Sequence, residues 1–404
     1  MLPRHGLGSP GCDYDVVVTT STPRPTLLII SFSRIVSDAR VLKQVALLRN
    51  DYEVTTCGYG EAPGGVAEHV EIPESLIAWR LDRLSTVLRR FERTYWRQEV
   101  VAWAQEHLEI GAHDIVLAND VETVPLALAL EPRLGVHADL HEYAPRQKED
   151  LRRWRRFVAP YQRYLCRRYI ARASSWTTVA TGLAAEYRRE FGFTPEVVVN
   201  AAPFQNLEPE PASVPLRLVH SGGAMPSRHL EIMIDAVANC ESEPTLDMYL
   251  VPANPSYVDA LREYAASRCP DRVRILDPLP YATLHRALSA YDIGIYVAPP
   301  VSFNHLWMLP NKVFDFVQAR LALIVSPNPE MKHLVTEHGL GRVTGGYTAE
   351  DLRREIDSFS VDEVMEAKAA SHRSATELSA ESVSDSWRRA IDALADRSPR
   401  RNDR

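Results

Sequence analysis

The stretch LPNKVFDFVQARLALIVSP, residues 309–327, carries its amide and charged side chains mainly at its start. Pro310 suits the first position of a helix, which leaves the backbone amides that follow it free to bind an anion. Lys312 adds a positive charge to that turn, and Asp315 follows Asn311 by four residues on the same helix face. Because a lysine suits phosphate and a carboxylate suits the hydroxyls of a ribose, this spacing predicts a nucleotide-diphosphate site. The alternative is an ordinary exposed Lys312–Asp315 pair.

A second candidate anion site lies in the segment SGGAMPSRHLEIMIDAV, which follows the strand-like run LRLVH. Gly222 and Gly223 allow backbone amides to approach a ligand closely. Arg228 lies just before or within the first turn of the next helical run, so a guanidinium, backbone amides and the helix dipole would converge on one anion. The alternative is a tight turn beside a solvated arginine.

Strand and helix patterns alternate around both candidate sites. Runs such as TLLIISF, DIVLAND, LRLVH and DIGIYVAP resemble buried strands, and helical patterns separate them, including one long helical stretch over residues 87–108. This order predicts an α/β protein with two doubly wound, Rossmann-like domains that face each other across a cleft. The expected divisions are a mobile leader (1–25), an N-terminal domain (26–200), a proline-rich linker (201–215), a C-terminal domain (216–375), a final helix (376–397) and a tail (398–404). Whether the final helix packs back on the first domain is left open.

Composition argues against several classes of protein. The chain of 404 residues has a net charge of −7, which is unlike a protein that coats nucleic acid. Its longest apolar runs are strand-sized and far shorter than the roughly 20 residues of a membrane span. The five cysteines are scattered, without a C-x-x-C pair or a nearby histidine at metal-ligand spacing. This pattern predicts a reducing cytoplasm and no structural zinc.

One segment, RRWRRFVAPYQRYLCRRYIAR at residues 152–172, has eight arginines interleaved with aromatic and aliphatic residues and no acid. A basic amphipathic helix of this kind can lie on an anionic membrane surface, which would place the protein peripherally at the inner membrane face. The alternative is a solvated helix face whose arginines pair with carboxylates elsewhere in the chain.

Five segments, in order along the chain, match motifs of one known family. SFSRIVSDARVLKQVALLRNDYEVTTCGYG resembles its first strand, D-x-R-V helix and second strand; LANDVETVPLALAL resembles its N-D-x-x-T-L-P segment; and ADLHEYAP resembles its D-x-H-E segment. SGGAMPSRHLEIMIDAV resembles the loop and helix in which a K-G or R-G pair contacts the donor, and PPVSFNHLWMLPNKVFDF resembles the segment with the motif P-N-K-L-F-E-Y. The chain thus resembles the family-4-type, retaining glycosyltransferases of the GT-B fold over residues 26–359.

The resemblance implies transfer of a sugar from a nucleotide-diphosphate donor to an acceptor hydroxyl, with retention of configuration and no cofactor. It assigns the first domain to the acceptor and the second to the donor. A UDP-sugar is the first expectation for the donor, with GDP- and dTDP-sugars as alternatives. The acceptor is expected to be a sugar, a lipid-linked group or a small molecule, as in polysaccharide or glycoconjugate biosynthesis. No D-x-D triplet lies in the matching segments, so cations and helix amides, rather than a metal ion, are expected to stabilise the leaving diphosphate.

The resemblance also implies roles for individual residues. His141 would face the donor sugar, and Arg228 and Lys312 would neutralise the diphosphate, which makes these three the catalytic candidates. The donor-binding candidates are Gly222, Gly223, Arg228, Asn304, Asn311, Lys312 and Asp315. The acceptor-side candidates are Asp120, Glu142 and Arg34, the last because its loop lacks the glycines of many relatives.

Three positions depart from the family pattern. Trp307 stands where the better-known version has a glutamate, eight residues before the second one, and His229 and Arg320 replace glycines. Contacts to the hydroxyls of the transferred sugar are therefore left unassigned. Two other functions stay open at this point: a nucleotide-sugar epimerase or hydrolase of the same fold, and a non-catalytic GT-B partner protein.

Overall fold

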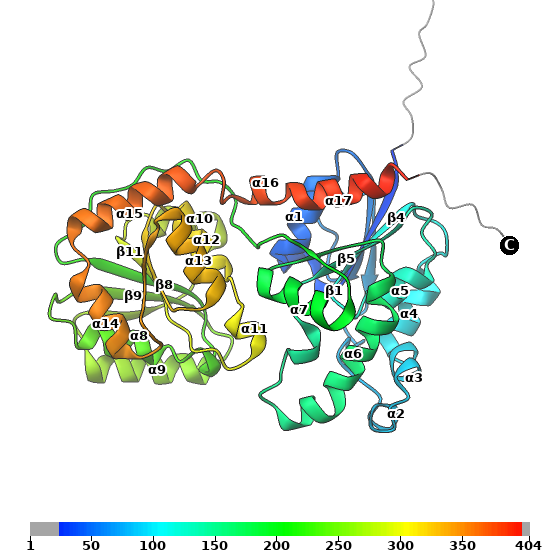
Figure 1. Ribbon diagram of the computed structural model, residues 1–404, viewed down its shortest axis with the longest axis horizontal. Coiled ribbons are helices and arrows are strands. Elements are labelled where there is room, and N and C mark those ends of the chain that lie inside the picture. Colours follow the sequence, from blue (N-terminus) through cyan, green and yellow to red (C-terminus); the bar gives the residue numbers. More distant parts are fainter. Residues whose placement is uncertain (1–23, 398–404) are drawn as a thin grey trace, which may run out of the picture.

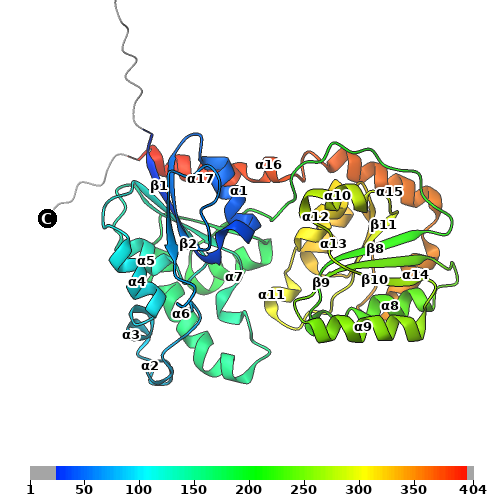
Figure 2. The ribbon, with the colours of Figure 1, turned by 180° about the vertical axis from the view of Figure 1, so that it is seen from behind.

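The computed structural model describes residues 24–397, which form two α/β domains lying side by side (Figures 1 and 2). The expected tail at 398–404 and nearly all of the expected leader at 1–25 fall outside the described residues. In the described part of the chain, no helix is both long and apolar enough to cross a membrane.

A seven-stranded parallel sheet forms the centre of the N-terminal domain, in the strand order β3-β2-β1-β4-β5-β6-β7. The chain steps outward from β1 in one direction and from β4 in the other, as in a doubly wound sheet. Helices cover both faces, which is why β1 and β4 are continuous apolar runs. The strands are β1 (Thr26–Arg34), β2 (Glu53–Tyr59), β3 (Glu68–Ile72), β4 (Ile115–Asn119), β5 (Gly135–Leu140), β6 (Ser175–Thr178) and β7 (Glu196–Val197).

The helices of this domain begin and end at residues suited to these positions. The carboxylate of Asp38 accepts hydrogen bonds from the first amides of α1, and Gly192, with a φ of 82°, ends α7 in the left-handed conformation. The expected long helix at 87–108 is wrong: Arg89 has a φ of 54°, and two short helices, α3 and α4, lie there, after α2 has ended at Val87. The helices are α1 (Ala39–Leu48), α2 (Arg83–Val87), α3 (Phe91–Trp96), α4 (Glu99–His107), α5 (Val124–Ala129), α6 (Ala159–Arg168), preceded by the π-helical turn η3 (Trp154–Val158), and α7 (Thr181–Phe191).

The C-terminal domain repeats the plan with a six-stranded parallel sheet, in the order β10-β9-β8-β11-β12-β13. Together the two sheets confirm the predicted α/β class with two Rossmann-like domains. The strands are β8 (Arg217–Gly223), β9 (Thr245–Val251), β10 (Val273–Leu276), β11 (Ile293–Tyr296), β12 (Ala322–Val325) and β13 (Gly341–Val343). The helices are α8 (Glu231–Ala238), α9 (Pro255–Arg268), α10 (Tyr281–Leu288), α11 (Phe303–Leu306), α12 (Asn311–Gln318), α13 (Pro329–His338), α14 (Ala349–Ser358) and α15 (Val361–Ser374).

The segment between the domains, residues 201–215, has no helix or strand and is anchored by the end of α12. Arg320 is 1% exposed, and its guanidinium donates to the backbone oxygens of Gln205 and Leu207. Gln318 accepts a hydrogen bond from the Gln205 amide. Arg320 has a φ of 64°, a conformation that favours the glycine of the family pattern. The hydrogen bonds from Arg320 to the linker therefore offset the strain of its left-handed backbone.

The last two helices, α16 (Ala380–Val383) and α17 (Asp385–Ala395), run from the C-terminal domain back to the N-terminal one (Figure 1). Ile391 and Leu394 of α17 pack in one apolar cluster with Leu27 and Ile29 of β1. Trp387 lies under a buried arginine of α1, Arg40, whose guanidinium carbon is 4.5 Å from the ring centroid. The end of the chain thus covers one face of the first sheet and ties the two domains together.

Candidate active site between the domains

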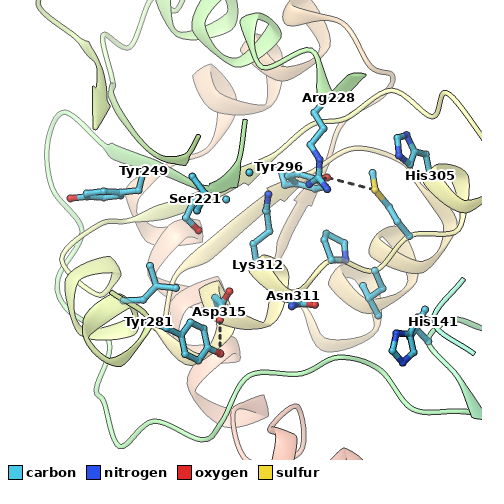
Figure 3. A pocket seen from close by; sticks show the side chains of 18 of the residues that line it. His141, Ser221, Arg228, Tyr249, Tyr281, Tyr296, His305, Asn311, Lys312 and Asp315 are labelled. Carbon is cyan, nitrogen blue, oxygen red and sulfur yellow. Dashed lines mark hydrogen bonds between the residues drawn. The ribbon is translucent and has the colours of Figure 1, made fainter. Parts of the chain in front are cut away.

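A cavity of about 600 Å3 lies between the two domains, at the carboxyl ends of the strands of both sheets (Figure 3). This is the place where open α/β sheets bind ligands. The structure brings nine of the eleven predicted site residues together here: His141, Glu142, Gly222, Gly223, Arg228, Asn304, Asn311, Lys312 and Asp315. Asp120 and Arg34 do not line the cavity. Arg34 instead pairs with Glu74 at 2.5 Å on the exposed surface.

Lys312, in the first turn of α12, is a buried cation without a hydrogen-bond partner among residues 24–397. Its Nζ lies 4.5 Å from the centroid of the Tyr296 ring. Burial first, and then the nearby charge of Arg228, lower the pKa of Lys312 to about 7, against the smaller opposing effect of the Asp315 charge. Gly222 makes room for this side chain: with a φ of 132°, a Cβ there would lie 2.4 Å from Nζ. Gly223 faces open space and carries no such constraint.

Arg228 approaches the same wall of the cavity from the loop after β8 (Figure 3). One terminal nitrogen donates to the Tyr296 hydroxyl at 3.2 Å, while Nε is buried and has no partner in the described part of the chain. The following residue, His229, has a φ of 50°, so it occupies the left-handed conformation for which the family uses glycine. Two basic side chains, each with a buried and unused nitrogen donor, thus line one cavity, and an anionic ligand would satisfy both.

Asp315 lies one turn further along α12 and is 6% exposed. His285 Nε2 donates to its Oδ1 at 2.9 Å, and the Tyr281 hydroxyl donates to the same oxygen at 3.4 Å. No hydrogen bond reaches Oδ2 from the described residues, so one carboxylate oxygen stays available at the cavity. Asn311 begins α12 and is exposed. Pro310 is the N-cap residue of α12 and not its first helical residue, which corrects the expectation from sequence.

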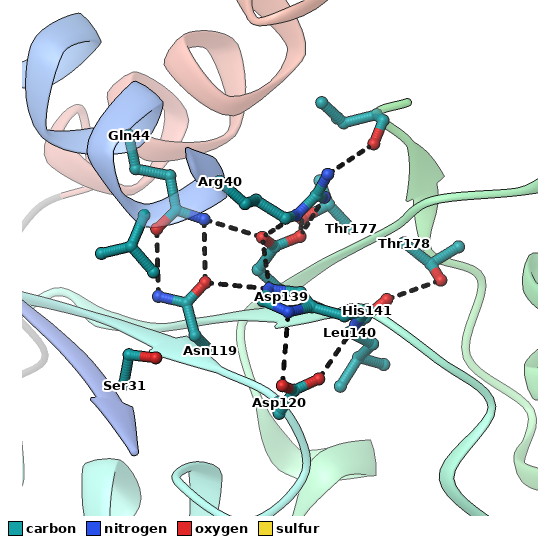
Figure 4. Close-up of polar contacts among 12 residues, drawn as sticks. Ser31, Arg40, Gln44, Asn119, Asp120, Asp139, Leu140, His141, Thr177 and Thr178 are labelled. Carbon is teal, nitrogen blue, oxygen red and sulfur yellow. Dashed lines mark hydrogen bonds and ion pairs between the residues drawn. The ribbon is translucent and has the colours of Figure 1, made fainter. Parts of the chain in front are cut away.

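His141, at the end of β5, forms the opposite wall, and both of its ring nitrogens face acceptors of its own domain (Figure 4). Nδ1 lies 3.3 Å from the Asp120 carboxylate, and Nε2 lies 3.2 Å from the Asn119 side-chain oxygen and 3.4 Å from Asp139. Burial alone would lower the pKa of His141, but the charges of Asp120 and Asp139 outweigh it and raise that pKa. A hydrogen bond from this ring to a sugar would replace one of these contacts.

Asp139 and its hydrogen-bond partners fix the position of the His141 side of the cavity. Arg40 donates to both of its oxygens, each at 2.7 Å, and Gln44 donates to it at 2.7 Å while also bonding Asn119. Burial disfavours the charged carboxylate, but Arg40 and His141 hold the pKa of Asp139 well below its ordinary value. The D-x-R-V and D-x-H-E segments quoted from the sequence therefore meet through Arg40 and Asp139, which were not predicted as site residues.

Short segments of the C-terminal domain close the cavity against the N-terminal one. The Asn304 side chain bonds the backbone nitrogen and oxygen of Tyr143, at 2.9 and 3.3 Å, so its amide is used between the domains. The ring of Trp307 lies against Gly182 at the start of α7, where a Cβ would come within 1.9 Å of a ring carbon. The tryptophan that replaces the family's glutamate therefore packs at the domain interface.

The metal-free expectation stays untested. Within residues 24–397, no three His, Cys, Asp or Glu side chains come together as a metal-binding cluster. The single D-x-D triplet of the chain, Asp13 to Asp15, lies outside the described residues.

Comparison with known proteins shows the fold. No protein-family model matches the chain, and no curated protein matches it by sequence. Anabaena HepE, solved with UDP and glucose, is similar in structure with a TM-score of 0.68 at 12% identity, over 92% of this chain and 100% of that one. A glycosyltransferase from Rickettsia africae has a TM-score of 0.66 at 11% identity, over 93% and 100%. An α,α-trehalose-phosphate synthase (UDP-forming) from Burkholderia vietnamiensis has a TM-score of 0.63 at 11% identity, over 91% and 100%. The chain has a GT-B fold, as the sequence predicted.

Proposed function

We propose that the protein is a glycosyltransferase that takes a sugar from a nucleotide-diphosphate donor. The observation that carries this proposal is the pair of buried, unsatisfied cationic groups, Lys312 Nζ and Arg228 Nε, on one cavity between two Rossmann-like domains. Leaving buried donors unpaired costs free energy, and a ligand with two phosphates would recover it. Structural neighbours with bound UDP or UDP-glucose support the same class of ligand.

The cations have a direct chemical use in this reaction. As the bond between the sugar and the diphosphate breaks, negative charge grows on the leaving oxygen, and Arg228, Lys312 and the first amides of α12 would stabilise it. Asp315, with Oδ2 available, would bind ribose hydroxyls. We propose that transfer proceeds without a metal and with retention, the acceptor hydroxyl attacking from the face that the diphosphate leaves. A UDP-sugar is the proposed donor.

An uncommon surface on the N-terminal domain supports a lipid-linked acceptor. Of the eight arginines at 152–172, only Arg163 and Arg167 form ion pairs within the described residues, both with Glu190, and the other six are exposed. This does not fit the alternative in which the arginines are neutralised by carboxylates. The neighbouring helix α2 contacts η3; its Leu84 is 69% exposed, and Leu88, the residue that follows it, is 53% exposed. Exposed apolar residues beside unpaired arginines suit the surface of an anionic membrane.

The first experiment is thermal unfolding of the protein with UDP, GDP, dTDP and ADP. A nucleotide that binds only the folded state raises the unfolding midpoint by mass action. We expect a rise with UDP that is weakened in Asp315→Ala and retained in Asp277→Ala, since the Asp277 carboxylate lies in the same domain and is 90% exposed. No rise with any of the four nucleotides would remove the glycosyltransferase proposal and favour a non-catalytic partner protein.

A second experiment separates transfer from epimerisation and tests the surface. Incubation with a UDP-sugar and no acceptor should leave the sugar unchanged; its conversion to an epimer would indicate the epimerase alternative. Sedimentation with vesicles should show binding when they contain anionic phosphatidylglycerol and none with phosphatidylcholine alone. Replacing Arg152, Arg153, Arg155 and Arg156 by serine should weaken this binding. Equal binding by both proteins would remove the membrane proposal and leave the donor site untouched.

A further inference from the structure

A second cavity, separate from the one between the domains, lies wholly within the N-terminal domain. It measures about 270 Å3, near the lower end of ligand pockets, roughly 300 Å3, so it suits a single ring and not a nucleotide. The segment before α2, the turn η3 and the start of α6 enclose it together with the loop after β4. We call it the Trp79–Trp154 cavity; its lining residues are Ala78, Trp79, Leu81, Gln98, Glu122, Gln147, Lys148, Trp154, Val158, Tyr161 and Gln162.

Two buried polar atoms on this lining have no partner within residues 24–397. They are Trp154 Nε1 and Gln162 Oε1, and Gln162 as a whole is 3% exposed. The Gln162 amide nitrogen donates to Glu122 Oε1 at 2.8 Å, so turning the amide over would only move the unpaired atom to its other end. Buried polar groups are normally hydrogen-bonded. One unpaired donor and one unpaired acceptor on the same small cavity therefore indicate a ligand that offers both kinds of group.

Other groups on the lining have the same dual character. Glu122 is half-buried, and its desolvation together with the nearby Asp120 charge raises its pKa to about 7, so it can donate or accept near neutral pH. Lys148 lies 5.8 Å from the Trp154 ring centroid. With one lysine and one carboxyl group, the cavity has no excess of positive charge that would favour phosphate. A lipid chain would leave both Trp154 Nε1 and Gln162 Oε1 without a hydrogen-bond partner.

The rings of Trp79, Trp154 and Tyr161 add apolar faces to these polar groups. A pyranose presents hydroxyls at its edge, each a donor and an acceptor, and C–H groups on its faces that pack on aromatic rings. The cavity also adjoins the cleft. Glu142 lines the cavity between the domains, and Gln147 lines the smaller one. Burial raises the pKa of Glu142, and a hydrogen bond from the Gln147 side chain opposes that rise, which links the two cavities.

We propose that the Trp79–Trp154 cavity binds a sugar ring of the glycosyl acceptor. That the cavity binds a sugar is inferred from the cavity alone. That this sugar belongs to the acceptor rests on the proposed function. Trp79, 63% exposed, marks the side from which such a ring would enter, beside the exposed face of α2. A lipid-linked saccharide could then bind its sugar in the cavity while its lipid part stays at the membrane.

The test is saturation-transfer difference NMR of the full-length protein with methyl glycosides of glucose, galactose, mannose and N-acetylglucosamine, in both anomers. We expect at least one to bind saturably. Affinity should fall at least tenfold in Trp154→Phe, which keeps a ring but loses the N–H donor, and in Gln162→Met. Ala78→Leu should do the same by filling the cavity. Trp103→Phe is the matched control, because Trp103 stacks on His107 outside the cavity, and its affinity should be unchanged.

Thermal unfolding with UDP, run on each variant, shows whether it is folded and keeps its donor site. If no glycoside binds while UDP still raises the midpoint, the sugar cavity is wrong and the proposed donor site stands. If a glycoside binds equally well to Trp154→Phe, Gln162→Met and Ala78→Leu, the sugar binds elsewhere and the proposal is overturned. The protein could also bind a glycoside, lose that binding in these variants, and bind none of the nucleotides. That result would support the sugar cavity and refute the glycosyltransferase proposal.

Discussion

Binding of a nucleotide diphosphate at pH 8 is expected to take up nearly one proton. Burial, and then Arg228, lower the pKa of Lys312 to about 7, so at pH 8 about nine-tenths of these side chains are neutral in the free protein. A diphosphate beside Nζ favours the ammonium form and returns the pKa toward its ordinary value. The missing proton, about 0.9 per site, then comes from the buffer.

The same change in pKa sets the expected effect on stability. A fall from 10.5 to about 7 corresponds to roughly 5 kcal/mol of free energy favouring the neutral amine in the folded protein. The unfolded state binds the proton more tightly, so the folded state is penalised fully below pH 7, and the penalty disappears as the pH rises toward 10.5. Lys312→Met should therefore raise the free energy of unfolding at pH 7 by about 2–4 kcal/mol, while nucleotide binding is lost.

The assay is titration calorimetry with UDP at pH 8 in two buffers of different ionisation enthalpy, since the difference in heat gives the number of protons exchanged. Lys332→Met is the control, because Lys332 is exposed on α13 of the same domain, and it should behave as the unmodified protein. Urea unfolding at pH 7 and pH 9 measures the stability effect. Uptake below about 0.2 proton, or undiminished UDP binding by Lys312→Met, would refute the assignment of Lys312 as the buried phosphate-binding amine.

Three other substitutions test other parts of the site. Gly222→Ala places a Cβ 2.4 Å from Lys312 Nζ at a φ of 132°, so it should reduce the UDP-induced rise in unfolding midpoint and cost about 1–3 kcal/mol in urea unfolding; the same change at Gly223, which faces open space, should spare UDP binding. Arg40→Met removes the partner of a buried carboxylate and should lower the free energy of unfolding by about 3–5 kcal/mol; a loss below 1 kcal/mol would mean that Asp139 does not depend on Arg40. Because the folded-state pKa of His141 is raised, its stabilising charge is fully present below pH 6.5 and is lost as the pH rises through the folded-state pKa; His141→Gln should flatten the difference in urea midpoint between pH 6 and pH 8, and an unchanged difference would contradict the ionic contact with Asp120.

The parts of the fold that follow from local periodicity could be predicted from the sequence. Buried parallel strands such as β1, β4 and β12 are apolar runs of strand length, and the order of strands and helices then leaves few topologies open. The strand β3, with the sequence EHVEI, was not predicted, because two glutamates and a histidine give no apolar run. It forms by pairing with β2 at the sheet edge, a contact that no local pattern reveals.

The site could be predicted only as far as its motifs are contiguous. Asn311, Lys312 and Asp315 follow from one helical turn, whereas the partners of Asp315 come from α10, where Tyr281 and His285 stand four residues apart. That spacing places two polar aromatics on one helix face and was the available signal. Arg40 and Asp139 are 99 residues apart in sequence, so nothing but the folded sheet brings them together.

The residues that depart from the family pattern become intelligible once the domains are in contact. Trp307 fills the space above Gly182, and Arg320 reaches the linker across a turn where glycine would be less strained. Lys312 departs from a more general rule, since a buried cation is expected to have a partner. A folded protein tolerates such a group where the missing partner is the ligand, and the unsatisfied Nζ on the lining of the cavity is the reason to look for a diphosphate there.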